Sequence, residues 1–173
     1  MANRTQLNRQ IAKLTGISKH TIDRIGVNLN KSGILLSGGR GRHAPDMSPE
    51  DLKTIILALL GSESTGTVFE TVLKLHAMES KDNDNFGDVL LDICSDSNKA
   101  SEVMQISVLR NYPQATIYWK DEGGTRTGKL QDFRGVTDKE QPGMRVIATL
   151  SGAVLSELVK LIYIPEKPDR RYY

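Results

Sequence analysis

The feature that most constrains this chain is a run of twenty residues near its start, NRQIAKLTGISKHTIDRIGV, from Asn8 to Val27. Ala12 is small enough to let a second helix approach closely. Gly16, four residues later, is free to adopt the positive φ that a tight turn requires. Ser18 suits the N-cap of a second helix, because its hydroxyl can accept an otherwise unpaired backbone N–H. The spacing predicts two helices that cross around a tight turn, which is the helix-turn-helix arrangement.

The side chains of this run divide between two faces. The apolar positions, which we expect to meet in a shared core, are Ile11, Leu14, Ile17, Ile22 and Ile25. The polar side chains of the second helix then point outward, and a helix of this kind enters the major groove of DNA with its N-terminus first. The candidate DNA-binding residues on it are Ser18, Lys19, His20, Thr21, Asp23 and Arg24.

These candidates have different chemistry. Lys19, His20 and Arg24 are the candidates for base edges or phosphates, and Arg24 suits the O6 and N7 acceptors of guanine. Phosphate repels a carboxylate, so we expect Asp23 to accept from a cytosine amino group or to pair with a neighbouring base. Arg4 and Arg9, on the preceding helix, are candidates for contacts with the DNA backbone.

A stretch rich in glycine and arginine follows. Ile34 to Leu36 is predicted as a short strand, and residues 37–43 as a turn that contains Arg40 and Arg42. A wing in the minor groove needs this composition, because glycines allow close approach and arginines suit the narrow, negative groove. The alternative is a charged linker between domains. The stretch lacks the Lys-Ser/Thr ending of a P-loop, which argues against nucleotide binding.

This order of elements resembles the MerR-like winged helices, a family that includes the DNA-binding domains of phage small terminase subunits. The resemblance covers about residues 5–60 and is carried by the segments GISKHTIDRI and GGRGRHAP. It implies groove readout by residues 18–24 and wing contacts from Arg40 and Arg42. MerR regulators continue into a long coiled coil and an effector or metal domain, and the sequence shows neither.

The distribution of charge agrees with a polyanionic partner for the first part of the chain. Residues 1–45 hold eight basic residues and one acid, a net charge of +7. Residues 46–100 hold four basic and eleven acidic residues, a net charge of −7, and residues 101–173 carry +2. A basic segment favours phosphate, because neutralising phosphates releases counterions. The alternative is a solvated basic face without a partner.

The region 48–96 is predicted to be helical. Ser48 can cap a helix, and Pro49 suits its first position. That helix, which runs to about Leu60, is apolar over more than one side, and further helices are predicted from Thr67 to Glu79 and after the acidic residues 81–85. These apolar positions indicate either ordinary core or a dimer or ring interface, so the region is a candidate for homo-oligomerisation.

The region 97–165 is predicted as a small α+β domain. After a polar link, strands are expected at Val103–Arg110, Ala115–Lys120, Gly128–Phe133 and Arg145–Leu150. A final helix is expected at Gly152–Ile164, and residues 166–173 form a polar, flexible tail. The fold class is therefore α+β: an N-terminal winged helix-turn-helix in residues 1–47, central helices, and a C-terminal antiparallel sheet with a final helix.

Several classes of protein find no support in the sequence. The three histidines are far apart, no catalytic motif is recognisable, and Cys94 is the single cysteine, so we expect neither an enzyme, nor a cofactor, nor a metal site. No apolar run approaches the roughly 18 residues that a membrane span needs. We see no signal peptide, and we expect a cytoplasmic protein, in the bacterial host cell if a phage encodes it.

Three functions are consistent with these patterns. The first is sequence-specific binding of double-stranded DNA by a transcription regulator of a phage or mobile element. The second is a terminase small subunit that recognises viral DNA for packaging. The third is a protein-interaction module. The candidate partners are double-stranded DNA, further copies of the chain, and another protein that binds the C-terminal domain; no membrane is expected.

Overall fold

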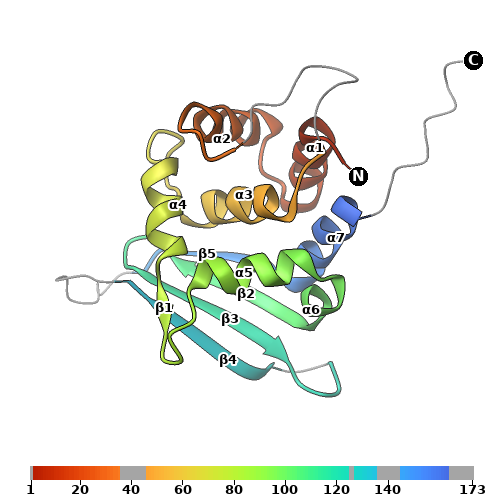
Figure 1. The fold of residues 1–173 in the computed structure, drawn as a ribbon, viewed down its shortest axis with the longest axis vertical. Helices are drawn as coiled ribbons and strands as arrows, with labels where there is room; N and C mark the ends of the chain where they lie inside the picture. Colours follow the sequence, from red (N-terminus) through yellow and green to blue (C-terminus); the bar gives the residue numbers. More distant parts are fainter. Residues whose placement is uncertain (1, 36–45, 125–126, 136–144, 164–173) are drawn as a thin grey trace, which may run out of the picture.

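The computed structural model describes residues 2–35, 46–124, 127–135 and 145–163. Within them, seven helices and one five-stranded antiparallel sheet form a mixed α+β fold. Figure 1 shows three levels: the sheet, the helices that cover one of its faces, and the pair α1 and α2 on the side away from the sheet. Helix α3 packs against α2, while α1 packs against α7 and α2 also packs against α4. The predicted fold class is confirmed at this level.

The first two helices are joined by the expected turn. Helix α1 (Arg4–Thr15) begins with a reciprocal cap between Asn3 and Gln6. It ends at Gly16, whose φ of +73° lies in the left-handed region and whose N–H donates to the Ala12 carbonyl. Helix α2 (Lys19–Lys31) begins at Ser18, whose Oγ accepts the Thr21 N–H at 3.1 Å. The predicted roles of Gly16 and Ser18 are therefore confirmed.

The strand predicted at Ile34–Leu36 is wrong for its first two residues. Gly33 has a φ of +75°, and the N–H groups of Ile34 and Leu35 both donate to the Leu29 carbonyl, at 3.1 and 3.4 Å. These bonds close the C-terminus of α2, so the two N–H groups are not available to a strand. Leu36 lies outside the described residues, as do Arg40, Arg42 and the predicted tail 166–173.

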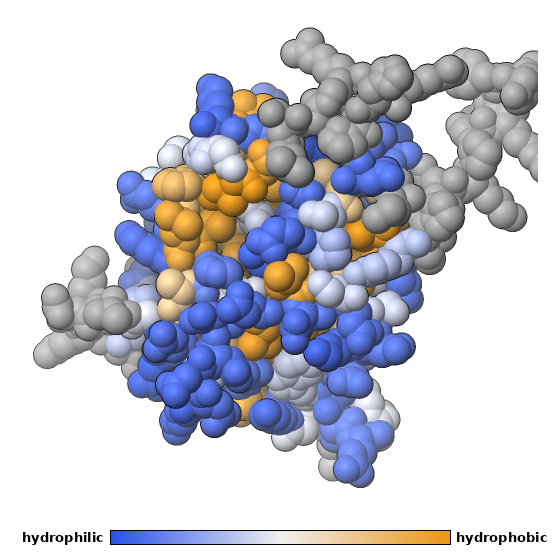
Figure 2. Space-filling view, in the orientation of Figure 1, coloured by the Kyte–Doolittle hydropathy of each residue, from blue (hydrophilic) through white to orange (hydrophobic). Residues whose placement is uncertain are grey.

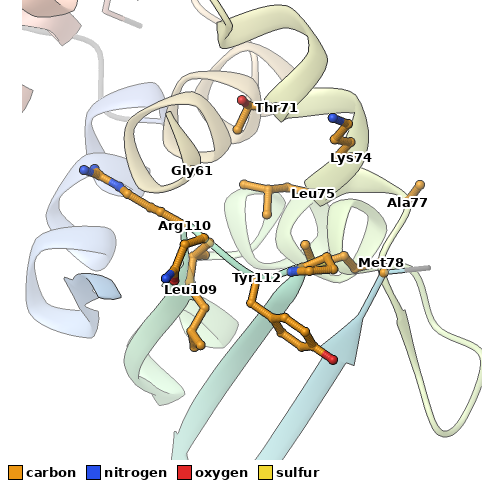
Figure 3. A pocket seen from close by; sticks show the side chains of 13 residues that line it. Gly61, Thr71, Lys74, Leu75, Ala77, Met78, Leu109, Arg110 and Tyr112 are labelled. Carbon is orange, nitrogen blue, oxygen red and sulfur yellow. The ribbon is translucent and has the colours of Figure 1, made fainter. Parts of the chain in front are cut away.

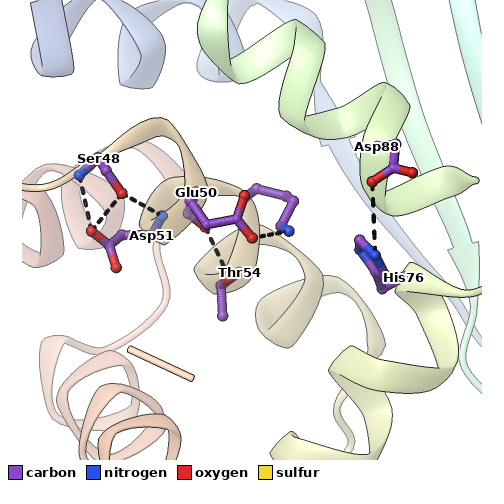
Figure 4. Close-up of polar contacts among 7 residues, drawn as sticks. Ser48, Glu50, Asp51, Thr54, His76 and Asp88 are labelled. Atoms are coloured by element: carbon purple, nitrogen blue, oxygen red, sulfur yellow. Dashed lines mark hydrogen bonds and ion pairs between the residues drawn. The ribbon is translucent and has the colours of Figure 1, made fainter. Parts of the chain in front are cut away.

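Helix α3 (Pro49–Gly61) is the most buried element of the fold. Its start is fixed by a capping box, in which the Asp51 N–H donates to Ser48 Oγ at 3.1 Å and the Ser48 N–H donates to Asp51 Oδ2 at 2.9 Å (Figure 4). Its buried side chains point in every direction around the axis: Leu52, Ile55, Ile56, Leu57, Ala58 and Leu60. The prediction of burial on more than one side is confirmed.

The segment after α3 differs from the prediction. Helix α4 (Val68–His76) ends before the expected Glu79, and residues Glu79–Ser80 form the short strand β1, paired with β4. The acidic residues that follow fold back onto Ser80, whose Oγ accepts the N–H groups of Asp82 and Asp84, both at 3.2 Å. Because the chain reverses its direction after Ser80, Glu79 can pair with β4 instead of extending helix α4. Helix α5 (Phe86–Ser95) follows.

The predicted polar link before the C-terminal region is a helix, α6 (Ser97–Glu102). Asp96 caps it, because its Oδ1 accepts the N–H groups of Asn98 and Lys99 at 2.7 and 3.4 Å. Ala100 is fully buried, and α6 packs against α7 (Gly152–Tyr163). The cap and the tertiary contact outweigh the weak helical pattern of this polar segment.

The sheet contains the four predicted strands, with bounds within two residues of those expected. These are β2 (Val103–Leu109), β3 (Gln114–Lys120), β4 (Thr127–Arg134) and β5 (Ile147–Ser151). With β1 the order is β1-β4-β3-β2-β5, and every pair is antiparallel. The helices cover the face that bears Ile106, Ile117 and Phe133.

One hydrophobic core runs through all three regions of the sequence. Its buried side chains form a single cluster from Leu7 in α1 to Ile162 in α7, and α1 packs against α7. Arg110, after β2, strengthens this connection, since its Nε and Nη2 donate to the carbonyls of Leu60 and Leu59 at 2.9 and 3.0 Å. The boundaries expected at residues 47 and 96 are not marked by a break in the core.

Substitution of two glycines tests the geometry of the α1–α2 turn. Gly16→Ala should lower the free energy of unfolding by about 1–2 kcal/mol, because alanine is strained at a φ of +73° although space for its Cβ exists. Gly26→Ala, inside α2, should raise it by roughly 0.5–1 kcal/mol, since the nearest atom, Arg4 Cδ, lies 3.9 Å from the new Cβ. Urea denaturation followed by circular dichroism measures both; equal effects would contradict the turn geometry.

Candidate nucleic-acid interface

The solvent-facing side of α2 is a row of four side chains, which we call the α2 stripe: His20, Arg24, Val27 and Lys31. All four are exposed, whereas Ile22, Ile25, Gly26 and Leu29 are buried on the opposite side of the helix. The spacing of four, three and four residues keeps the stripe on one face, because an α-helix has 3.6 residues per turn. Helix α2 lies at the end of the molecule away from the sheet (Figure 1), so the stripe faces solvent.

The stripe contains two residues that the sequence prediction missed. Val27 was expected only as the end of the motif, and Lys31 was not assigned to the helix at all. The available signal was the inward spacing of Ile22, Ile25 and Leu29, which continues the helix beyond Val27. Val27 is 45% exposed, which makes it a prominent apolar side chain among cationic and polar neighbours.

Asp23 does not project freely into solvent, because three side chains gather around it. Lys19 Nζ lies 2.5 Å from Asp23 Oδ2, and Asn8 Nδ2 donates to Asp23 Oδ1 at 2.9 Å. Partial burial would raise the pKa of Asp23, but the hydrogen bonds from Lys19 and Asn8, with the positive charges of Lys19 and Arg4, hold that pKa below its ordinary value. At neutral pH Asp23 is therefore charged and offsets the charge of Lys19.

The two hydroxyl residues at the start of α2 are used within the protein. Ser18 Oγ caps the helix, and it lies 2.8 Å from the Thr21 Oγ1 atom in a hydrogen bond that either hydroxyl can donate. Ser18 is exposed and Thr21 half-buried. Their contact with DNA stays a prediction, and it would begin from hydroxyl groups that already have partners.

The two arginines of α1 occupy different environments. Arg4 packs across α2 near Gly26, and its Nη1 atom is buried without a hydrogen-bond partner among the described residues. Arg9 is exposed, as is Lys13 one turn later. The structure therefore presents Arg9 to solvent and holds Arg4 against α2, while backbone contacts from either residue stay predictions.

A cavity of about 600 Å³ lies away from the α2 stripe, between α4 and the β2–β3 turn. Figure 3 shows its two cationic side chains, Lys74 and Arg110, on opposite sides, and Arg110 is directed toward α3. The guanidinium of Arg110 is engaged with the carbonyls of Leu59 and Leu60. Of the two cationic groups at this cavity, that of Arg110 is therefore already hydrogen-bonded within the protein.

In the part of the chain that the structure describes, no three or more His, Cys, Asp or Glu side chains gather where a metal ion would bind. His76 Nε2 lies 3.8 Å from Asp88 Oδ1, which is a single pair on the surface (Figure 4). In the same residues, no helix has the length and apolar character needed to cross a membrane.

Comparison of the chain with protein-family models, with curated proteins and with solved structures gives no match.

For the DNA contact that the sequence predicts for α2, the network around Asp23 indicates that this residue lowers the affinity. Asp23→Asn removes one negative charge and releases Lys19, so affinity for duplex DNA should rise. The slope of log K against log salt should steepen by about 0.9, the equivalent of one phosphate contact. Asp92→Asn is the matched control, because Asp92 also pairs with a lysine, Lys99, at 3.2 Å but lies on α5. Fluorescence anisotropy at several salt concentrations measures both, and weaker binding by Asp23→Asn would contradict the prediction.

Proposed function

We propose that this chain binds double-stranded DNA with α2 in the major groove, as a winged helix-turn-helix protein. The observation that carries the proposal is the α2 stripe, which presents His20, Arg24 and Lys31 on one exposed face of a helix that is capped and positioned by its neighbours. A thirteen-residue helix is about 20 Å long and 10–12 Å across with its side chains, which fits a major groove about 12 Å wide.

The chemistry of the stripe suits base edges as well as phosphates. Arg24 can donate two hydrogen bonds to guanine, and within the described residues its guanidinium forms no ion pair that would compete. Val27 offers the kind of apolar surface that contacts a thymine methyl group. The net charge of +7 in residues 1–45 adds attraction to any DNA sequence.

Within this proposal, the chain acts as a sequence-specific transcription regulator of a phage or mobile element. The support for this proposal is that the rest of the fold leaves one face of α2 exposed, on the side of the molecule away from the sheet (Figure 1). A terminase small subunit would use the same helix but would assemble as a closed ring, and an interaction module would leave DNA unbound. Absolute mass by light scattering, with and without DNA, separates the three functions. A regulator is expected to bind DNA as a dimer, a terminase subunit to form a ring, and an interaction module to keep the same mass when DNA is added.

Arg24→Ala should weaken binding to a duplex selected from a random pool by roughly 10–100-fold, the value of a bidentate contact with a base. Arg134→Ala is the matched control, because Arg134 is also exposed but lies on β4, in the sheet and not on α2. Anisotropy with the selected duplex gives the affinities, and the same duplex with deoxyuridine for thymine tests the contact of Val27. Equal effects of the two arginine variants would remove the basis for the proposed orientation.

A further inference from the structure

The outer side of α4 carries a pair of exposed apolar side chains. Val68, Val72 and Leu75 anchor the helix in the core, whereas Phe69 and Leu73, one turn apart, are 40% and 50% exposed. Figure 2 shows orange surface in the region where Figure 1 places α4 and the adjoining edge of α2. Two large apolar side chains one turn apart give this exposed helix face an apolar strip, which is the kind of surface that a partner can cover.

Two side chains of opposite charge border this pair. Glu70 and Lys74 each follow one of the apolar residues in the sequence, and both are exposed. Their spacing of four residues, with the glutamate first, is the arrangement that best allows an ion pair along one helix. Across the described residues, however, neither of them forms an ion pair or a hydrogen bond with a side chain. Both charges are therefore available to a partner.

We propose that α4 pairs antiparallel with α4 of a second copy of this chain. A two-fold axis that lies between the two helices, perpendicular to them and level with residues 71–72, brings Phe69 of one copy to Leu73 of the other, and Glu70 of one copy to Lys74 of the other. Each contact occurs twice, as in any interface in which both subunits use the same surface. The order apolar–acidic, then apolar–basic along the helix makes the face complementary to itself when its direction is reversed.

The two kinds of contact are compatible with one axis. The midpoint of residues 69 and 73 is residue 71, and the midpoint of residues 70 and 74 is residue 72. These positions differ by about 1.5 Å along the helix, which side-chain rotamers can accommodate. Helix α4 lies at the outer edge of the molecule (Figure 1), so a second α4 can approach it. This match of charges favours a second copy over an unrelated partner.

Charge reversal in the full chain tests the pairing by sedimentation equilibrium. The unaltered chain should dimerise. Glu70→Lys alone and Lys74→Glu alone should each raise the dimer Kd roughly 100-fold, since each places two like-charge contacts in the interface. An equimolar mixture of the two variants should dimerise again, because every lysine then meets a glutamate of the other variant. Glu122→Lys, an exposed reversal in the β3–β4 turn, is the control and should dimerise like the unaltered chain.

Each outcome decides the proposal. Restored association in the mixture supports antiparallel pairing of α4, because two copies joined elsewhere would not respond to it. An unaltered chain that stays monomeric at millimolar concentration would overturn the proposal. So would dimers that neither single variant weakens, or a mixture that remains monomeric. Circular dichroism of each variant shows that the fold is kept, which is expected for exposed positions.

Discussion

The burial of α3 on all sides is the constraint on which the rest of this structure depends. A helix with apolar side chains around its whole circumference is stable in water only when other elements surround it. Helices α2, α4, α5 and α7 and the strands β2 and β5 supply this cover, which makes the N-terminal helices and the sheet parts of one core. Arg110 completes the arrangement, because it satisfies the Leu59 and Leu60 carbonyls, which the end of α3 would otherwise leave unpaired.

This packing determines how α2 meets its surroundings. Ile22, Ile25 and Leu29 hold it in the core, and the Asn28 side chain donates to the Thr65 carbonyl in the loop before α4. The α2 stripe occupies the opposite, exposed side of the helix. The helical period that buries Ile22, Ile25 and Leu29 therefore also determines which residues face solvent, and these are the ones that we propose to contact DNA. Asp23 moderates this basic surface, because its low pKa keeps it ionised at neutral pH. Its contribution to stability is present at neutral pH and is lost as the pH falls through the lowered pKa of this carboxyl group.

The sequence allowed the parts that depend on local chemistry to be predicted. The turn at Gly16, the caps at Ser18 and Ser48, and four strands of the sheet follow from backbone preference and side-chain period, and the structure contains them. The predictions were wrong where contacts with other parts of the chain decide the local structure. Strand β1 exists because β4 pairs with it, and Ile34 and Leu35 close α2 because Leu29 accepts their N–H groups. For the candidate site, His20 and Arg24 were foreseen, but Lys31 and the engagement of Asp23 by Asn8, fifteen residues away, were not.

The most direct test of the account is an NMR titration of the ¹⁵N-labelled chain with a pool of random-sequence duplexes about 20 base pairs long, at low salt. The account predicts that the largest amide shifts lie along α2, at residues of the stripe and at its N-terminus, while the amides of β2, β3 and β4 stay unchanged. Shifts concentrated on the sheet would contradict the proposed orientation of α2. A spectrum that does not change at any DNA concentration would contradict DNA binding itself.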